Sequence, residues 1–149
     1  MVSIRQLEKK DILSVVQIAT MTMPYPWNAA TFQDCLGNDY HAWVLELNNI
    51  IIGFVIVLLQ ADECQLMNIA IDPGYQRRGY ASDLLQHAIK FAKSHGSKRL
   101  WLEVRKSNHP AIEFYQKWGG LRIAVRKNYY PCENGREAAY VFSIDLCLH

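Results

Sequence analysis

Apolar segments of strand length recur along this chain, and several alternate with polar residues, which predicts β-strands. A tight turn at Asn48-Asn49 joins two of them into a hairpin. Segment 98–104 has the apolar, β-rich composition of a strand buried on both faces. Segment 127–137 has the composition of a turn. The predicted strands cover residues 2–7, 41–48, 51–60, 64–72, 98–104, 121–126 and 138–146.

Elsewhere the apolar positions follow the helical period, and cap residues mark the helix ends. Asp11 can cap a helix that ends near Met21, and Asn28 can cap a short helix through Leu36. A longer helix starts after Arg77 and ends at Gly96. The last is capped by Ser107 or Asn108, has Pro110 in its first turn and ends at Gly119-Gly120. The apolar face of the long helix comprises Ala81, Leu84, Leu85, Ala88, Ile89 and Ala92.

The predicted element order is β-α-α-β-β-β-α-β-α-β-β. Residues 64–104 form a βαβ unit, which implies one parallel strand pair with a right-handed crossover. The hairpins imply antiparallel neighbours. We therefore expect an α/β fold with a mixed, mostly antiparallel central sheet and helices on both faces, in a single domain spanning residues 1–149.

Composition narrows the class of protein. The chain has 149 residues, of which 50% are hydrophobic, and its net charge of +2 is low for a large nucleic-acid surface. The apolar run 51–59 is too short to cross a bilayer as a helix, and the N-terminus lacks a signal-peptide core. The four cysteines form no Cys-x-x-Cys pair. We expect a cytoplasmic protein with reduced thiols, no membrane anchor and no metal; His41, His87, His95, His109 and His149 show no ligand spacing.

The sequence QRRGYASDLL (76–85) predicts an anion site. Arg77 and Arg78 lie where a helix begins, and two cations beside the positive end of a helix dipole are unfavourable unless an anion binds there. Gly79 lets the chain approach that ligand closely. Neither the Walker nor the dinucleotide glycine pattern is present, so a diphosphate bound without metal fits best. The alternative is that Gly79 only turns the chain and the arginines lie in solvent.

Segment 68–85 resembles the acetyl-CoA-binding motif of the GNAT N-acetyltransferases, in which residues 76–81 match the loop Gln/Arg-x-x-Gly-x-Gly/Ala. Segments 25–32, 100–119 and 125–142 resemble the bacterial enzymes that acetylate the N-terminal alanine of a small-subunit ribosomal protein. The resemblance implies acetyl-CoA as cosubstrate, direct transfer, a ribosomal protein N-terminus as partner and no direct nucleic-acid contact. Gly120 replaces the family's usual Phe, with the loss of an aromatic contact, and Tyr80 replaces a smaller loop residue.

The resemblance also implies the residues that hold the cofactor. Strand 64–72 would offer backbone groups to the pantetheine arm, and in the family a bulge there opens the sheet. Asn108 would bond the same arm or only cap its helix. The expected cofactor-binding residues are Ile69, Ala70, Ile71, Gln76, Arg77, Arg78, Gly79, Tyr80, Ala81, Ser82 and Asn108.

Two residues are candidates for proton transfer. Glu103 interrupts an apolar strand near its C-terminal end and is the candidate base, directly or through water; the alternative is a surface glutamate paired with Arg105. Tyr115 is the candidate acid for the departing thiolate, a role that the resemblance implies. From periodicity alone it would be a core tyrosine. Trp27, Tyr129 and Tyr130 are candidate walls of a peptide groove, or packing residues.

Alternative functions remain open at this stage. A related enzyme would acetylate another protein N-terminus, a lysine side chain or a small amine. A second class is a non-catalytic module that binds CoA or, through its arginines, RNA.

Overall fold

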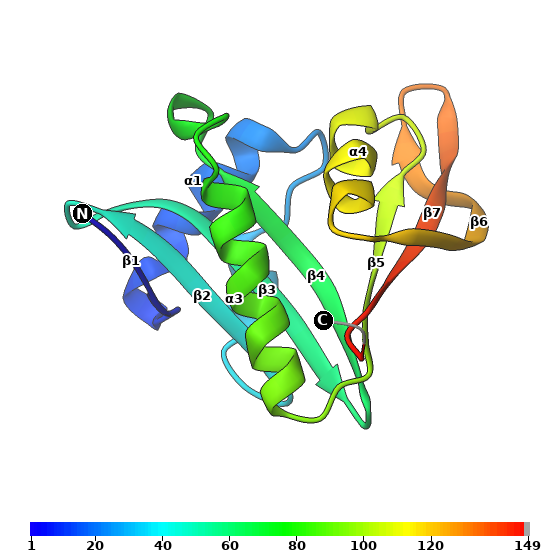
Figure 1. Cartoon of the computed structure of the whole chain (residues 1–149). Coiled ribbons are helices and arrows are strands. Elements are labelled where there is room, and N and C mark those ends of the chain that lie inside the picture. The colour runs from blue at the N-terminus through cyan, green and yellow to red at the C-terminus, as the bar shows by residue number, and fades with distance from the viewer. Residues whose placement is uncertain (148–149) are drawn as a thin grey trace.

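The computed structural model describes residues 1–147 and confirms the predicted order of helices and strands (Figure 1). Two short 3₁₀ turns, η1 and η2, are additional. The elements are β1 (Val2–Gln6), η1 (Lys9–Asp11), α1 (Ile12–Thr22), α2 (Ala29–Asp34), β2 (Tyr40–Leu47), β3 (Ile50–Gln60), β4 (Glu63–Ile71), η2 (Pro73–Tyr75), α3 (Tyr80–Ser94), β5 (Arg99–Arg105), α4 (His109–Lys117), β6 (Leu121–Cys132) and β7 (Gly135–Asp145).

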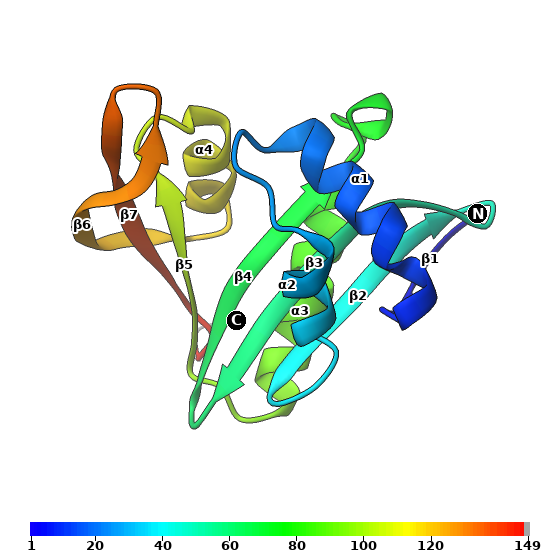
Figure 2. The same cartoon turned by 180° about the vertical axis from the view of Figure 1, so that it is seen from behind.

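The strands form one seven-stranded sheet in the order β1-β2-β3-β4-β5-β7-β6. Among residues 1–147, only β4 and β5 pair in parallel, and every other neighbouring pair of strands is antiparallel. Helices α3 and α4 cover one face, and α1 and α2 cover the other (Figures 1 and 2). The expected mixed, mostly antiparallel sheet between two helical layers is therefore confirmed.

Each face of the sheet has its own hydrophobic cluster. On the α3–α4 face, the predicted apolar stripe of α3, including the fully buried Leu84 and Leu85, packs on the central strands. On the α1–α2 face, Phe32 of α2 packs edge-on against Phe54 of β3, with ring centroids 5.3 Å apart. Truncating a fully buried leucine such as Leu84 to alanine typically costs about 2–5 kcal/mol, so these clusters fix the sheet that carries the site.

The parallel pair β4–β5 is short, and this opens the sheet. Pairing runs only from Glu63 with Arg99 to Leu66 with Leu102. At that point β4 also slips in register against β3, because Met67 is an extra residue between the partners of Ile56 and Val57. Beyond the bulge the two strands diverge (Figure 1). The bulge that the resemblance implied, but that no sequence pattern revealed, is thus present in β4.

Two expectations about strands are wrong. Strand β5 is not buried on both faces: Leu102 and Val104 are buried, whereas Trp101 and Glu103 on the opposite face are only partly covered. Segment 127–137 is not one long turn, since β6 continues to Cys132 and β7 begins at Gly135. A bulge in β6 between Arg126 and Tyr130 takes up the extra residues. Beyond this bulge the two strands pair again as far as Cys132 with Gly135, so only a short hairpin turn joins them.

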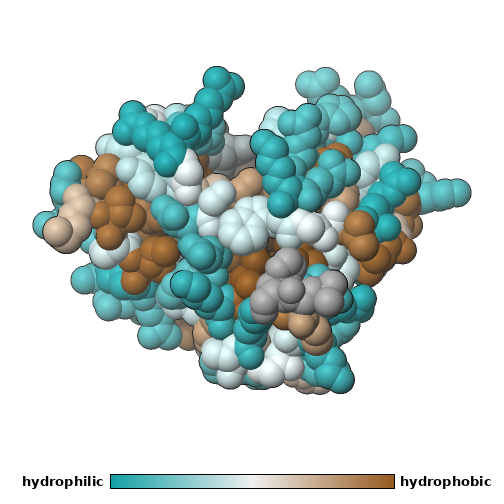
Figure 3. Space-filling model, in the orientation of Figure 1, coloured by the Kyte–Doolittle hydropathy of each residue, from teal (hydrophilic) through white to brown (hydrophobic). Residues whose placement is uncertain are grey.

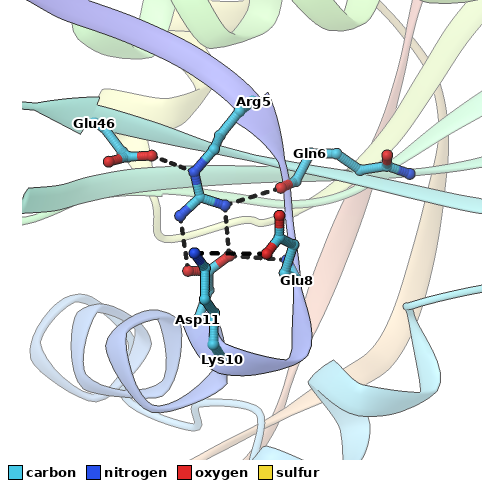
Figure 4. Close-up of polar contacts among 6 residues, drawn as sticks. All are labelled: Arg5, Gln6, Glu8, Lys10, Asp11 and Glu46. Carbon is cyan, nitrogen blue, oxygen red and sulfur yellow. Dashed lines mark hydrogen bonds and ion pairs between the residues drawn. The ribbon is translucent and has the colours of Figure 1, made fainter. Parts of the chain in front are cut away.

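The predicted cap of α1 is wrong in one respect: Asp11 occupies the N-cap position, but its side chain makes no capping hydrogen bond to that helix. The Arg5 guanidinium donates to both Asp11 carboxylate oxygens, at 2.7 and 2.8 Å, and also pairs with Glu46 of β2 (Figure 4). The backbone N–H of Glu8 donates to Asp11 as well. These contacts of Arg5 join β1, β2 and the start of α1. Because Asp11 is only 3% exposed, its bidentate pair with Arg5 is partly shielded from water.

Within residues 1–147, no helix combines the length and the apolar character needed to cross a membrane. The four cysteines carry free thiols, two buried and two at least partly accessible.

Candidate active site

A cavity of about 770 Å³ lies at the divergence of β4 and β5. The α1–α2 loop, the start of α3 and the helix α4 complete its walls. Figure 3 shows the molecular surface notched at the top, between the η2–α3 turn and α4. Of the residues predicted for the site, all but Arg78 and Tyr129 line this cavity: Trp27, Ile69, Ala70, Ile71, Gln76, Arg77, Gly79, Tyr80, Ala81, Ser82, Glu103, Asn108, Tyr115 and Tyr130.

One end of the cavity is formed by the start of α3. Gly79 is the N-cap residue and has φ +86°, a left-handed conformation that favours glycine. The first backbone bond of the helix runs from the N–H of Asp83 to the carbonyl of Gly79. The N–H groups of Tyr80, Ala81 and Ser82 therefore have no carbonyl partner within the helix and point away from its start. With the helix dipole they make this end suited to an anion.

The two arginines of this turn lie in different places. Arg77 lines the cavity, with φ +65°, whereas Arg78 does not line it. The Arg78 guanidinium lies 5.5 Å from the centre of the Tyr75 ring, in cation–π contact. Gln76 Nε2 donates to the carbonyl of Ile71 at 3.0 Å, which ties the turn to the end of β4. The structure thus brings one of the two arginines to the cavity lining, not both as expected.

Glu103 lies at the opposite end of the cavity, on β5, and only 11% of its side chain is exposed. The Tyr129 hydroxyl donates to Oε1 at 3.3 Å, and Gln65 Nε2 makes a long contact of 3.4 Å to the same oxygen. Arg126 Nε lies 2.7 Å from Oε2, but without the alignment of a hydrogen bond, so the contact is an ion pair. The alternative pairing with Arg105 is wrong, because Arg105 instead pairs with Glu137 at 3.1 Å.

Tyr115 lies on α4 and belongs to the hydrophobic cluster of that face, where it is 7% exposed. It also lines the cavity, so the core and catalytic interpretations are compatible. Burial, assisted by the nearby Tyr130, raises the pKa of the Tyr115 phenol above its ordinary value. The phenol therefore remains protonated at neutral pH, the state that a proton donor requires.

The wall nearest Glu103 is built from aromatic side chains around one arginine. The Arg105 guanidinium lies between the rings of Tyr25 and Tyr130, 5.1 and 4.5 Å from their centres. Burial, with the charge of Glu103 as a smaller cause, raises the pKa of Tyr130 to about 12. Tyr129 reaches Glu103 without lining the cavity, and Trp27 packs against Phe32 while lining it.

Other expected and unexpected residues complete the site. Asn108 caps α4, because its side chain accepts from the N–H of Ala111 at 3.3 Å, and it also lines the cavity. Sequence reasoning missed Tyr25 and Asn68, which also line it. The signal for Asn68 was a polar residue in an otherwise apolar stretch of strand. Tyr25 had no signal beyond its place beside Trp27.

Gly120, the departure from the family pattern, has a packing role. Its N–H donates to the carbonyl of Tyr115 at 2.9 Å. A Cβ at this position would lie only 2.7 Å from that carbonyl oxygen. A side chain here would push against the end of α4 that carries Tyr115.

Among residues 1–147, no group of three or more histidine, cysteine or acidic side chains is arranged to hold a metal ion. His149 lies outside these residues.

Residues 4–120 match the model of the Acetyltransferase (GNAT) family. The ribosomal protein bS18-alanine N-acetyltransferase of Escherichia coli is 36% identical over 146 residues, which cover 98% of this chain and 99% of that protein. The enzyme of the same name from Haemophilus influenzae is 40% identical over 96% of this chain and 98% of its own length. The crystal structure of the Escherichia coli enzyme superposes with a TM-score of 0.92 at 37% identity, covering 98% of this chain and 94% of that one.

Proposed function

The chain belongs to the GNAT family of acetyltransferases, and we propose that it transfers the acetyl group of acetyl-CoA to the N-terminal alanine of the ribosomal protein bS18. Relatives of nearly the same length, 36–40% identical, carry the name of that reaction. The acceptor would place this chain with ribosomal proteins in the cytoplasm, acting as one acetyltransferase domain over residues 1–149.

The cavity supports this proposal because it has two chemically different ends. The N–H groups of residues 80–82 and the Arg77 guanidinium would hold the diphosphate of the cofactor. The pantetheine arm would then follow the open edge of β4 at residues 69–71, past Asn108. This path carries the thioester to the point where β4 and β5 part.

The acceptor amine would enter from the other side of the sheet. Leu102 and Val104 pack in the cluster of the α3–α4 face, so Glu103, between them on the strand, faces α1 and α2. Tyr115 belongs to the cluster of the α3–α4 face. Glu103 and Tyr115 therefore lie on opposite faces at the same opening, and this is the single observation on which the proposal depends most. Donor and acceptor would then approach that opening from opposite faces.

The chemistry assigned to the two residues is a direct acyl transfer. The neutral amine attacks the thioester carbonyl, and Glu103 takes the proton that the nitrogen loses, directly or through a water molecule. When the tetrahedral intermediate collapses, the C–S bond breaks and Tyr115 protonates the departing thiolate. No side-chain nucleophile is needed, because the amine itself forms the new bond.

An N-terminal amine suits this modest machinery. With a pKa of about 7.7–8.0, roughly a tenth to a third of α-amines are neutral between about pH 7.0 and 7.4, against at most about one lysine in a thousand. One carboxylate is thus enough for an N-terminus, whereas a lysine would need stronger help.

The test is acetylation of two synthetic peptides, one with the N-terminal sequence of bS18 and one with a blocked N-terminus and an internal lysine. We expect a mass increase of about 42 Da, one acetyl group, on the first peptide only. Acetylation of the lysine peptide alone would refute the proposed acceptor.

The RNA-binding alternative makes a different prediction. RNA bound by arginines is released steeply as salt rises, and CoA would not displace it. Saturable, CoA-dependent turnover of the bS18 peptide that RNA does not inhibit would exclude that alternative.

A further inference from the structure

Asn68 is a buried polar residue to which the chemistry above gives no role. It is 9% exposed and lines the cavity, yet its Nδ2 has no hydrogen-bond partner among residues 1–147. A buried amide N–H without an acceptor destabilises the folded protein. A ligand that brought an acceptor to this nitrogen would recover that cost on binding.

The position of Asn68 indicates which ligand this is. It is separated by Met67 from Leu66, the last residue of β4 that pairs with β5, and Glu103 directly follows the paired Leu102 on β5. The two side chains thus flank the start of the opening, one from each diverging strand.

Both also face the same side of the sheet. Ile69 and Ile71 pack in the cluster of the α3–α4 face, and Ala70 packs in the cluster of the α1–α2 face. Since side chains alternate along a strand, Asn68 shares the face of Ala70, which is the face of Glu103. This is the side from which the acceptor enters, not the side of the cofactor.

A peptide N-terminus offers two groups to such a pair. Its α-amine is the nucleophile, directed to Glu103, and its first carbonyl oxygen is an acceptor one carbon further along. A lysine ε-amine has no carbonyl at that distance.

We propose that Asn68 Nδ2 donates a hydrogen bond to the carbonyl oxygen of the acceptor's first residue, and that this bond helps to select α-amines over lysine side chains. The inference rests on the proposed function. It adds a residue that positions the acceptor and takes no part in proton transfer.

The experiment is a double-mutant cycle between enzyme and substrate. Wild type and Asn68→Leu, which keeps the branching of the side chain but removes the donor, are each assayed with the bS18 peptide and with the same peptide carrying an (E)-alkene in place of its first peptide bond. The alkene removes the carbonyl oxygen. For wild type we expect kcat/KM to fall about 10- to 100-fold on the alkene peptide. For Asn68→Leu we expect a comparable loss on the normal peptide and less than about 3-fold further loss on the alkene.

If Asn68→Leu and the alkene lower kcat/KM independently, so that their fold-losses multiply when the two changes are combined, the proposal is overturned. CoA affinity should be the same in both proteins, and a large change in it would also overturn the assignment to the acceptor side. Ser97→Ala is the matched control, because Ser97 is likewise buried with an unpartnered hydroxyl but does not line the cavity. We expect it to leave the kinetics unchanged.

Two further measurements keep the outcomes distinct. If Asn68→Leu does not fold by circular dichroism, Asn68→Asp, which removes the donor while keeping the shape, takes its place in the cycle. Wild-type turnover of the normal peptide reports on the proposed function itself. If wild type acetylates no α-amine, the proposed function fails, whereas normal turnover without coupling refutes only the role of Asn68.

Discussion

Glu103 and Tyr115 face the opening between β4 and β5 from opposite sides of the sheet. Tyr130 is electrostatically coupled to both: the charge of Glu103 helps to raise its pKa, and Tyr130 in turn helps to raise that of Tyr115. A carboxylate and a protonated phenol thus lie at the same opening, one on each face of the sheet. This geometry allows one group to take a proton from the acceptor while the other gives a proton to the donor.

The first prediction concerns these two residues. Glu103→Gln and Tyr115→Phe should each lower kcat for the bS18 peptide about 10²- to 10³-fold, because each removes a proton-transfer group. The dissociation constant of CoA, measured by calorimetry, should change less than about 3-fold, since neither residue lies at the diphosphate end. A rate within a few-fold of wild type for either variant would exclude the role given to that residue.

The second prediction concerns the alkaline side of the pH–rate profile. Burial raises the pKa of Tyr115, so the phenol stays protonated throughout the range in which an ordinary tyrosine would begin to ionise. As a proton donor it should therefore cause no fall in kcat as the pH rises to about 10. Gly37→Ala, a substitution at an exposed glycine outside the cavity, is assayed in parallel. A fall in kcat that both proteins share at high pH would reflect loss of the folded enzyme. A kcat that falls with a midpoint near pH 9, with the fold intact, would contradict the buried, protonated phenol.

The third prediction tests the turn before α3. Gly79→Ala places a side chain at φ +86°, which costs about 1–2 kcal/mol, although a Cβ there meets no atom within 4 Å. Because the anion site needs this conformation, we expect CoA to bind about 5- to 30-fold more weakly, as measured by calorimetry. Gly37→Ala is the control, since Gly37 has open space around it, lacks a positive φ and lies outside the cavity. Equal CoA affinity in both variants would show that the turn is not the diphosphate site.

The fourth prediction concerns stability and pH. The Arg5 guanidinium holds the pKa of Asp11 below its usual value, so the ionised carboxylate stabilises the folded state. This contribution is fully present above the unfolded-state pKa of about 3.9 and is lost as pH falls through the lower folded-state value. Asp11→Asn should therefore lower the free energy of unfolding by about 1–3 kcal/mol at pH 7 in urea titrations. The difference from wild type should shrink below pH 4.

Asp62→Asn provides the control for this pair. Asp62 lies 3.7 Å from Lys98 with 59% of its side chain exposed, so its removal should cost less than about 0.5 kcal/mol. A similar loss for both variants would mean that the partly buried position of Asp11 adds nothing.

The sequence predicted the elements well where a local signal existed. The 3.6-residue period of α3 and the N-caps Asn28 and Asn108 needed only neighbouring residues to be recognised, and all three are confirmed. The turn before α3 was equally local, because a glycine and two arginines before an amphipathic helix already indicate an anion site.

The features that depend on distant segments could not be read in this way. Met67 looks like any other strand residue, and it is a bulge only in its pairing with β3, where the consecutive Ile56 and Val57 face Asn68 and Leu66. The alternative that paired Glu103 with the nearby Arg105 failed for the same reason. Arg126 lies 23 positions further along the chain and reaches Glu103 from β6, which bulges just beyond it, whereas the neighbouring Arg105 is drawn to Glu137.

The four-residue ladder between β4 and β5 has a consequence for how the protein persists in the cell. It is the only strand pairing, among the described residues, between the antiparallel half made of β1–β4 and the half made of β5–β7. Because so few backbone pairs join the two halves of the sheet, local opening is expected at this point before the rest of the protein unfolds. Acetyl-CoA bound between β4 and β5 would stabilise the closed, folded state. The lifetime of the enzyme would therefore rise and fall with the concentration of its own cosubstrate.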